Sequence, residues 1–243
     1  EGCRRCARSL FGPGSSHYRL ALTRFQAICC SSLPDIGQSL TVLSVLLFSL
    51  TIHEMAHAVT ADWYGDPTAR RLGRISLNPI VHIDPIGTIL LPLLGLFLGG
   101  FVFGWAKPVP VNPANLQNHR RDFLVIALAG PASNIGLAIG ASMLLGMVPG
   151  GLGASGGASA AIVTLGFAML QLNLLLAVFN MLPIPPLDGG NVLAGVLPED
   201  LATGYDRLVR PYGFLILVVL MWTGWLYRLI GPPLSFLMGW LLP

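Results

Sequence analysis

His53, Glu54 and His57 form the pattern His-Glu-Met-Ala-His, in which two imidazoles are four positions apart. Residues at i and i+4 of a helix lie one turn apart on the same face, and this spacing lets both imidazoles bind one zinc ion. Glu54 lies at the edge of that face, where a carboxylate can act as a general base toward water. The pattern predicts a hydrolytic zinc centre. The alternatives are a coincidental motif or a histidine pair packed against a neighbouring helix.

The surroundings of this motif are apolar. Residues 40–61 form a stretch long enough to cross a bilayer, and the two imidazoles and the carboxylate lie within it. Ionisable groups at membrane depth are energetically costly, so their presence indicates a function. This setting favours a metal site over a coincidental motif.

A zinc ion held by two histidines needs a third protein ligand, and a carboxylate is a common one. Asp188 is the only charged residue between Asp122 and Glu199, and it follows an apolar segment. We therefore expect Asp188 to be the third ligand. An Asp-Gly dipeptide also favours a simple turn, so that interpretation stays open. Asp84 and His82 are rival ligands. They lie in a polar loop near arginines, where charged residues are common without a metal.

The composition is that of a membrane protein. Hydrophobic residues make up 53% of the chain, charged residues 10%, and the mean hydropathy is +0.70. Soluble domains carry about 25% charged residues. We expect an all-α polytopic membrane protein with about 4–6 transmembrane helices and a short β or re-entrant segment. The formal net charge is +3 and the basic residues are scattered, so the chain is not expected to bind nucleic acid.

Apolar runs and helix-breaking residues predict where the helices lie. The first helix should cover residues 40–63, because Gly65, Asp66 and Pro67 follow it. Further spans are predicted over residues 122–147, 158–182 and 212–227. Residues 231–243 are apolar but short, with Pro232 and Pro233 at their start.

Residues 85–106 carry no charge and are long enough to span. We expect them instead to enter the membrane and return, because basic residues flank both ends and the glycines and proline within weaken a continuous helix. A crossing here would also place Asp188 and the two histidines at opposite faces. Residues 107–111 should be extended and could serve as an edge strand for an unwound substrate.

The four cysteines, Cys3, Cys6, Cys29 and Cys30, all lie in the first thirty residues, away from the apolar motifs. The predicted chemistry therefore does not use thiols. Residues 1–33 also carry five arginines, and we expect them to form a disordered or interfacial extension. Residues 34–243 should form one membrane domain.

Three ordered motifs resemble the site-2 protease family of intramembrane zinc metalloproteases, in its compact bacterial type without PDZ or regulatory domains. They are residues 53–57, 129–134 and 180–190, and shorter matches occur at 65–68, 78–79, 82–85 and 104–110. The resemblance implies that His53, His57 and Asp188 bind one Zn²⁺ and that Glu54 is the catalytic base. It also implies that Asn134 and Asn180 help to hold the substrate, although buried asparagines commonly join helices to one another.

The implied activity is hydrolysis of peptide bonds in or near transmembrane segments of single-span membrane proteins, as in regulated intramembrane proteolysis. The apolar spans predict a multi-pass protein of the cell membrane, embedded in the lipid bilayer. The distribution of arginine and lysine predicts that its active site lies nearer the cytoplasmic face. A zinc or other metal-ion transporter and a catalytically inactive scaffold are the alternatives. A transporter needs a polar path across the membrane, whereas this sequence offers a single polar cluster.

Overall fold

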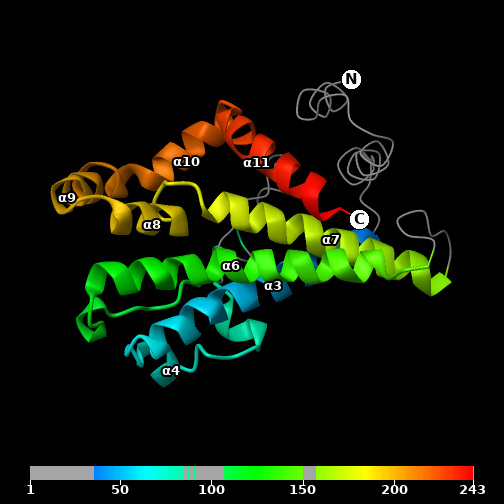
Figure 1. The fold of residues 1–243 in the computed structure, drawn as a ribbon, viewed down its shortest axis with the longest axis horizontal. Coiled ribbons are helices and arrows are strands. Elements are labelled where there is room, and N and C mark those ends of the chain that lie inside the picture. Colours follow the sequence, from blue (N-terminus) through cyan, green and yellow to red (C-terminus); the bar gives the residue numbers. More distant parts are fainter. Residues whose placement is uncertain (1–35, 85–86, 88–89, 91–106, 150–156, 243) are drawn as a thin grey trace.

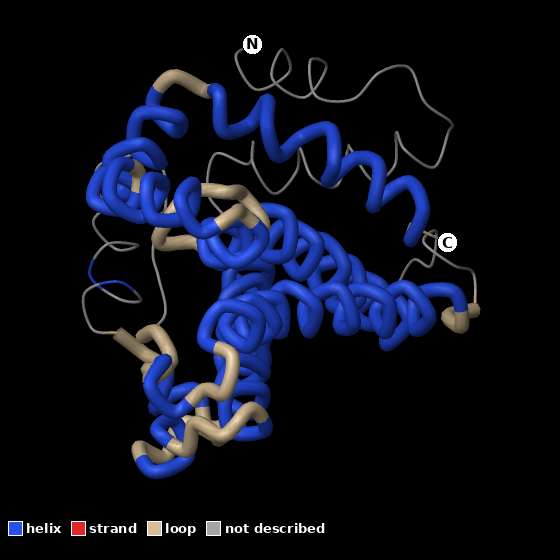
Figure 2. The backbone as a smooth tube through the Cα atoms, turned by 60° about the vertical axis from the view of Figure 1, so that its left-hand side comes forward, coloured by secondary structure: helices blue, strands red, loops and turns tan. Residues whose placement is uncertain are grey.

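The computed structural model describes residues 36–84, 87, 90, 107–149 and 157–242. Within these ranges the secondary structure is helical and contains no strand (Figure 2). The predicted N-terminal extension, residues 1–33, lies outside the described residues.

Three long helices form the centre of the protein: α3 (Ile36–Trp63), α6 (His119–Gly146) and α7 (Gly157–Asn180). All three are long and apolar enough to cross a membrane. They run alternately in opposite directions, so that the end of α3, the start of α6 and the end of α7 lie at the same side of the molecule (Figure 1). The predicted spans over residues 40–63, 122–147 and 158–182 are therefore confirmed within a few residues, as is the all-α polytopic membrane fold.

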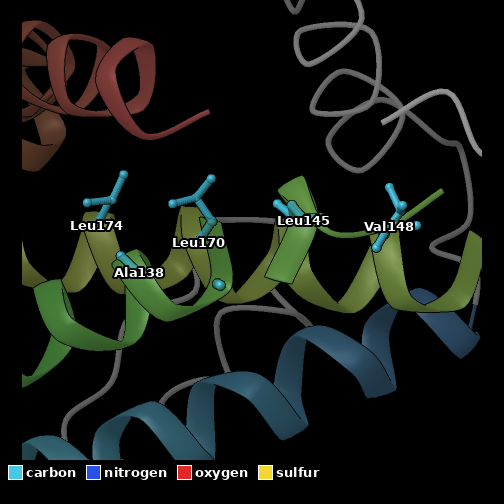
Figure 3. Packing of buried hydrophobic residues seen from close by; sticks show 7 residues of the cluster. Ala138, Leu145, Val148, Leu170 and Leu174 are labelled. Atoms are coloured by element: carbon cyan, nitrogen blue, oxygen red, sulfur yellow. The ribbon is translucent and has the colours of Figure 1, made fainter. Parts of the chain in front are cut away.

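The main apolar core lies between α6 and α7. Leu145 of α6 and Leu170 and Leu174 of α7 are buried there together with small residues such as Ala138 (Figure 3). A Cβ atom at Gly166 would stand 2.9 Å from Leu145 Cδ2, so the absence of a side chain allows this close packing. Dense packing of small residues is how membrane helices associate without a hydrophobic driving force from lipid.

The connection after α3 is tied back to the helix end by Asp66. This side chain is fully buried and accepts hydrogen bonds from Thr68 N–H (3.1 Å), Asn112 N–H (2.6 Å) and Asn115 Nδ2 (2.7 Å). These hydrogen bonds hold the pKa of Asp66 below its usual value although burial alone would raise it. Asp66 thus fixes the segment before α6 against the base of α3.

Short helices fill the rest of this connection: α4 (Thr68–Arg71), η1 (Pro79–His82) and η3 (Pro113–Asn115). Residues 107–112 have no regular secondary structure, as their prolines predict. They form no strand with the described residues, so the edge-strand role stays a prediction. The re-entrant prediction for residues 85–106 falls almost entirely outside the described residues. The flanks of that stretch meet, because Lys107 N–H donates to His82 O at 2.8 Å.

The chain after α7 forms α8 (Asp188–Val196), α9 (Glu199–Leu208), η5 (Arg210–Tyr212), α10 (Gly213–Trp222) and α11 (Trp225–Leu241). The predicted continuous span over residues 212–227 is wrong. Gly224 adopts a left-handed conformation with φ of 75°, and the helical segments on either side are bent by 83°. The described residues therefore contain three candidate spans, or four if the bent pair counts as one.

The C-terminal helix is also longer than the sequence suggested. Pro232 and Pro233 lie inside α11 and do not begin a separate short segment. Pro232 and Pro233 lack the N–H groups that would bond to Arg228 O and Leu229 O, and membrane helices tolerate such prolines better than soluble helices do. Leu234, Leu237 and Met238 of α11 pack against the core between α6 and α7.

Candidate metal centre

His53 and His57 of α3 meet Asp188, the first residue of α8. The distances are 3.1 Å from His53 Nε2 to Asp188 Oδ2, 3.3 Å from His57 Nε2 to Asp188 Oδ1, and 3.1 Å between the two Nε2 atoms. Ligand atoms about 2.0–2.1 Å from a tetrahedral zinc are about 3.3 Å apart from each other. The three side chains therefore have the spacing that a zinc ion requires of its ligands.

The outer nitrogens of both imidazoles face acceptors. His57 Nδ1 lies 2.7 Å from the backbone carbonyl of Ile126, which can only accept, so Nδ1 carries the proton. His53 Nδ1 lies 2.6 Å from Asn134 Oδ1. With Nδ1 protonated in each ring, both Nε2 atoms present lone pairs toward Asp188. This is the arrangement in which an outer hydrogen bond orients a metal-binding histidine.

These groups fit a cation. Two Nε2 lone pairs 3.1 Å apart repel each other, and a carboxylate beside them adds negative charge. Asp188 Oδ2 is a buried oxygen without a hydrogen-bond partner among the described residues. His53 and His57 are only 4% and 8% exposed, so water screens this repulsion poorly. The chemistry of this donor set matches the two-histidine, one-carboxylate sets that bind catalytic zinc.

Gly130 of α6 leaves the space in which the two imidazoles converge. A Cβ atom at this position would stand 2.3 Å from His57 Nε2 and 2.6 Å from His53 Nε2. Both distances are far shorter than a van der Waals contact, so no other residue fits here without moving the histidines. The need for a glycine at position 130 therefore comes from the space that the two imidazoles occupy, and not from backbone flexibility.

Asp188 reaches the histidines because the chain turns back after α7. Gly189 makes this turn compact, since a Cβ atom there would lie 2.4 Å from Leu182 O. Arg120 of α6 donates from Nη2 to Ala194 O at 3.1 Å and also to Leu197 O, which holds the end of α8 along α6. Asp188 and Gly189 are the first two residues of α8, so the simple Asp-Gly turn that the sequence left open is not formed.

Glu54 lies next to this cluster on α3 and is half-buried. Its Oε2 accepts a hydrogen bond from Val109 N–H at 3.2 Å. Pro108 and Pro110 have no N–H, so Val109 provides the only main-chain donor within residues 108–110. Segment 107–111 therefore lies beside Glu54 at Val109.

The rival ligands lie elsewhere. Among the described residues, the group of side chains that could hold a metal ion contains neither Asp84 nor His82. His82 is buried, with Nε2 3.0 Å from Ser76 O, and Asp84 Oδ1 accepts from Gly87 N–H at 2.7 Å. Asn180, at the end of α7, donates from Nδ2 to Leu176 O at 3.0 Å.

Several residues of this centre were not identified from the sequence. They are Ile126, whose carbonyl orients His57, and Ser49 and Asn173, which continue the hydrogen bonding beyond Asn134. Asn173 is one of a few polar residues within a mostly apolar span, together with Thr164 and Gln171, and that pattern could have marked it as a candidate. No sequence signal marks a backbone carbonyl.

Two histidines and a glutamate within a candidate membrane helix, with an aspartate brought against the histidines by α8, define the class of membrane-embedded metalloenzymes. The family model of Peptidase family M50 matches residues 151–221. The protein named "Putative zinc metalloprotease YwhC" of Bacillus subtilis is 39% identical over 179 residues, which cover 73% of this chain and 78% of the relative. The chain belongs to this peptidase family, the site-2 proteases, and is a zinc metalloprotease.

A second relative agrees with this assignment. "Putative zinc metalloprotease Rip2" of Mycolicibacterium smegmatis is 34% identical over 221 residues, which cover 86% of this chain and 79% of the relative. Comparison with solved structures finds no match.

Proposed function

We propose that this protein is an intramembrane endopeptidase that cleaves single-span membrane proteins in or near their transmembrane segments, as a step of regulated proteolysis. Residues 34–243 would form the catalytic domain. The observation that carries the proposal is the position of the metal centre: His53 and His57 lie within the candidate span Leu40–Trp63 and meet Asp188 there. A peptide bond must come to this depth to be cleaved.

His53, His57 and Asp188 would hold the zinc ion, which lowers the pKa of water and polarises a peptide carbonyl when bound. Glu54 accepts a proton from the attacking water and passes it to the leaving amine. The Val109 N–H holds one oxygen of Glu54 and so positions the carboxylate beside the two histidines. Half-burial of Glu54 leaves a path for water to reach it.

A helical substrate hides its carbonyls in hydrogen bonds from i to i−4, so it must unwind locally before attack. Unwound backbone needs new partners in a membrane interior. Residues 107–111 have no regular secondary structure and lie beside Glu54 at Val109, and in an extended conformation they could supply such partners by strand addition. Asn180, half-buried at the end of α7, is a further candidate for contact with the substrate.

The active site would face the cytoplasmic side. Arg70, Arg71 and Arg74 follow α3, and Arg120 and Arg121 begin α6, so these basic residues gather at one end of the bundle (Figure 1). The loop after α6, at the opposite end, contains no charged residue from 147 to 159. Cytoplasmic loops are enriched in arginine and lysine. The metal centre lies in the half of α3 that ends at the basic side.

The test is cleavage by detergent-purified protein of a panel of single-span peptides containing helix-breaking residues, with mass spectrometry to locate the cut. Cleavage in or near the apolar segment that is lost in chelator and restored by zinc supports the proposal. Glu54→Gln, loaded with zinc, is the inactive control. Chelator-resistant cleavage would contradict the proposal, as would zinc flux into liposomes by a protein without peptidase activity.

A further inference from the structure

A line of buried polar side chains leads away from the metal centre through all three central helices. It starts at His53 on α3, where Nδ1 lies 2.6 Å from Asn134 Oδ1 on α6. Asn134 Nδ2 donates to Asn173 Oδ1 on α7 at 2.9 Å. Asn173 Nδ2 then donates to Ser49 Oγ, back on α3, at 2.9 Å and to Met169 O at 2.8 Å.

Burial makes these hydrogen bonds energetically important. Ser49, Asn134 and Asn173 are each 0% exposed and lie within candidate membrane spans. A buried amide left without partners destabilises a protein, because it has lost its hydrogen bonds to water and gained none in return. Each amide of this line uses both its oxygen and its nitrogen in a hydrogen bond, so neither Asn134 nor Asn173 is free to turn toward another partner.

The direction of the hydrogen bonds is set at the far end of the line. Met169 O is a backbone carbonyl and can only accept, so Asn173 must turn its Nδ2 toward it. Asn173 Oδ1 then faces Asn134 and requires Nδ2 from that side chain. Asn134 Oδ1 is left to face His53, which must donate from Nδ1.

We propose that Asn173 is a positioning residue of the metal centre: acting through Asn134, it holds His53 with its proton on Nδ1 and its Nε2 lone pair directed at the metal. The proposal rests on the metal assignment of the proposed function. It gives Asn134 a role different from the substrate contact that the family resemblance implies, because both polar atoms of its side chain are already used within the bundle.

The experiment measures zinc affinity by competition with a chromogenic chelator, on full-length protein in detergent. Removal of a group that orients a metal-binding histidine typically weakens metal binding 10–100-fold. We expect Asn173→Leu to weaken zinc binding about 10-fold and Asn134→Leu at least as much. Thr51→Val is the matched control: Thr51 is buried on the metal-binding helix but donates only to Leu47 O of its own helix, at 2.7 Å. It should bind zinc like the wild type.

A double-mutant cycle separates positioning from a general loss of packing. If Asn173 acts through Asn134, then Asn173→Leu changes nothing further in an Asn134→Leu background. Thermal unfolding of the metal-free proteins checks that each variant folds. Should Asn173→Leu fail to fold, Asn173→Ser takes its place, because a serine can bond to Met169 O but is too short to reach Asn134.

Two results would overturn the inference: wild-type zinc affinity in the Asn173 variant, or a loss that adds in full to that of Asn134→Leu. The Michaelis constant for peptide at saturating zinc should be unchanged in both asparagine variants, whereas a substrate-binding role would raise it. Failure of the proposed function is a different outcome, namely wild-type protein that binds no zinc or cleaves no peptide. If the wild-type protein binds zinc and cleaves peptide, the double-mutant cycle tests only the role of Asn173.

Discussion

Replacement of Gly130 by alanine should remove zinc from this protein while leaving its fold intact. The added Cβ would stand 2.3 Å from His57 Nε2 and 2.6 Å from His53 Nε2, where ordinary contacts begin at 3.4 Å. The imidazoles must therefore retreat by about 1 Å, whereas metal–ligand distances hold to within about 0.2 Å. We expect zinc affinity to fall on the order of 100-fold or more.

The same substitution elsewhere on α6 provides the control. A Cβ atom at Gly136 or Gly140 meets no described atom within 4 Å. Alanine favours a helix by about 1 kcal/mol relative to glycine, so Gly136→Ala and Gly140→Ala should keep or raise the thermal stability. Both should bind zinc like the wild type.

Zinc affinity from chelator competition and zinc content from elemental analysis would be measured on monodisperse protein in detergent. Stoichiometric zinc at wild-type affinity in Gly130→Ala would refute the geometry of the centre. So would an equal loss of zinc in Gly136→Ala, because that loss could not come from contact with the histidines.

Glu54→Gln should abolish cleavage yet retain zinc, because it removes the proton acceptor and leaves the three ligands; restored turnover at high peptide concentration would argue against this role. The folded-state pKa of Asp66 is lowered, so its stabilising effect is present above its ordinary pKa and is lost as the pH falls through the folded value. The melting temperature in detergent should therefore fall more steeply below about pH 4 for the wild type than for Asp66→Asn; parallel curves would contradict this. Single cysteines at Asp84 and Gln117, in a cysteine-free background, should react with an impermeant thiol reagent from the same face of vesicles, and labelling from opposite faces would refute the re-entrant arrangement of residues 85–106.

The spans were predicted correctly from the sequence wherever helix-breaking glycine or proline residues follow an apolar run. Gly65 and Pro67 correctly placed the end of α3 at Trp63. The last span failed because residues 212–227 are uniformly apolar, and apolar length alone does not show that Gly224 turns the chain. Hydropathy shows whether a segment can lie in an apolar environment. Whether a glycine adopts a left-handed backbone conformation depends instead on how the surrounding helices pack.

The candidate site could be predicted only in part. The histidine spacing and the isolated Asp188 identified the three residues that the fold brings together. The contacts of Asn173, Ser49 and the Ile126 carbonyl could not be predicted, because a helix that is apolar on every side carries no pattern to show which face meets which neighbour. The rotation of each helix about its axis decides those contacts, and packing sets that rotation.

Zinc content of Asp188→Ala, compared with wild type and Glu54→Gln in the same preparation, tests the central claim most directly. Elemental analysis should find one zinc ion per chain in the wild type and in Glu54→Gln, with cleavage only in the wild type. Asp188→Ala should lose most of its zinc and all of its cleavage, since two histidines alone bind the ion weakly. Full zinc occupancy in Asp188→Ala would contradict the account and return Asp84 and His82 to consideration as ligands.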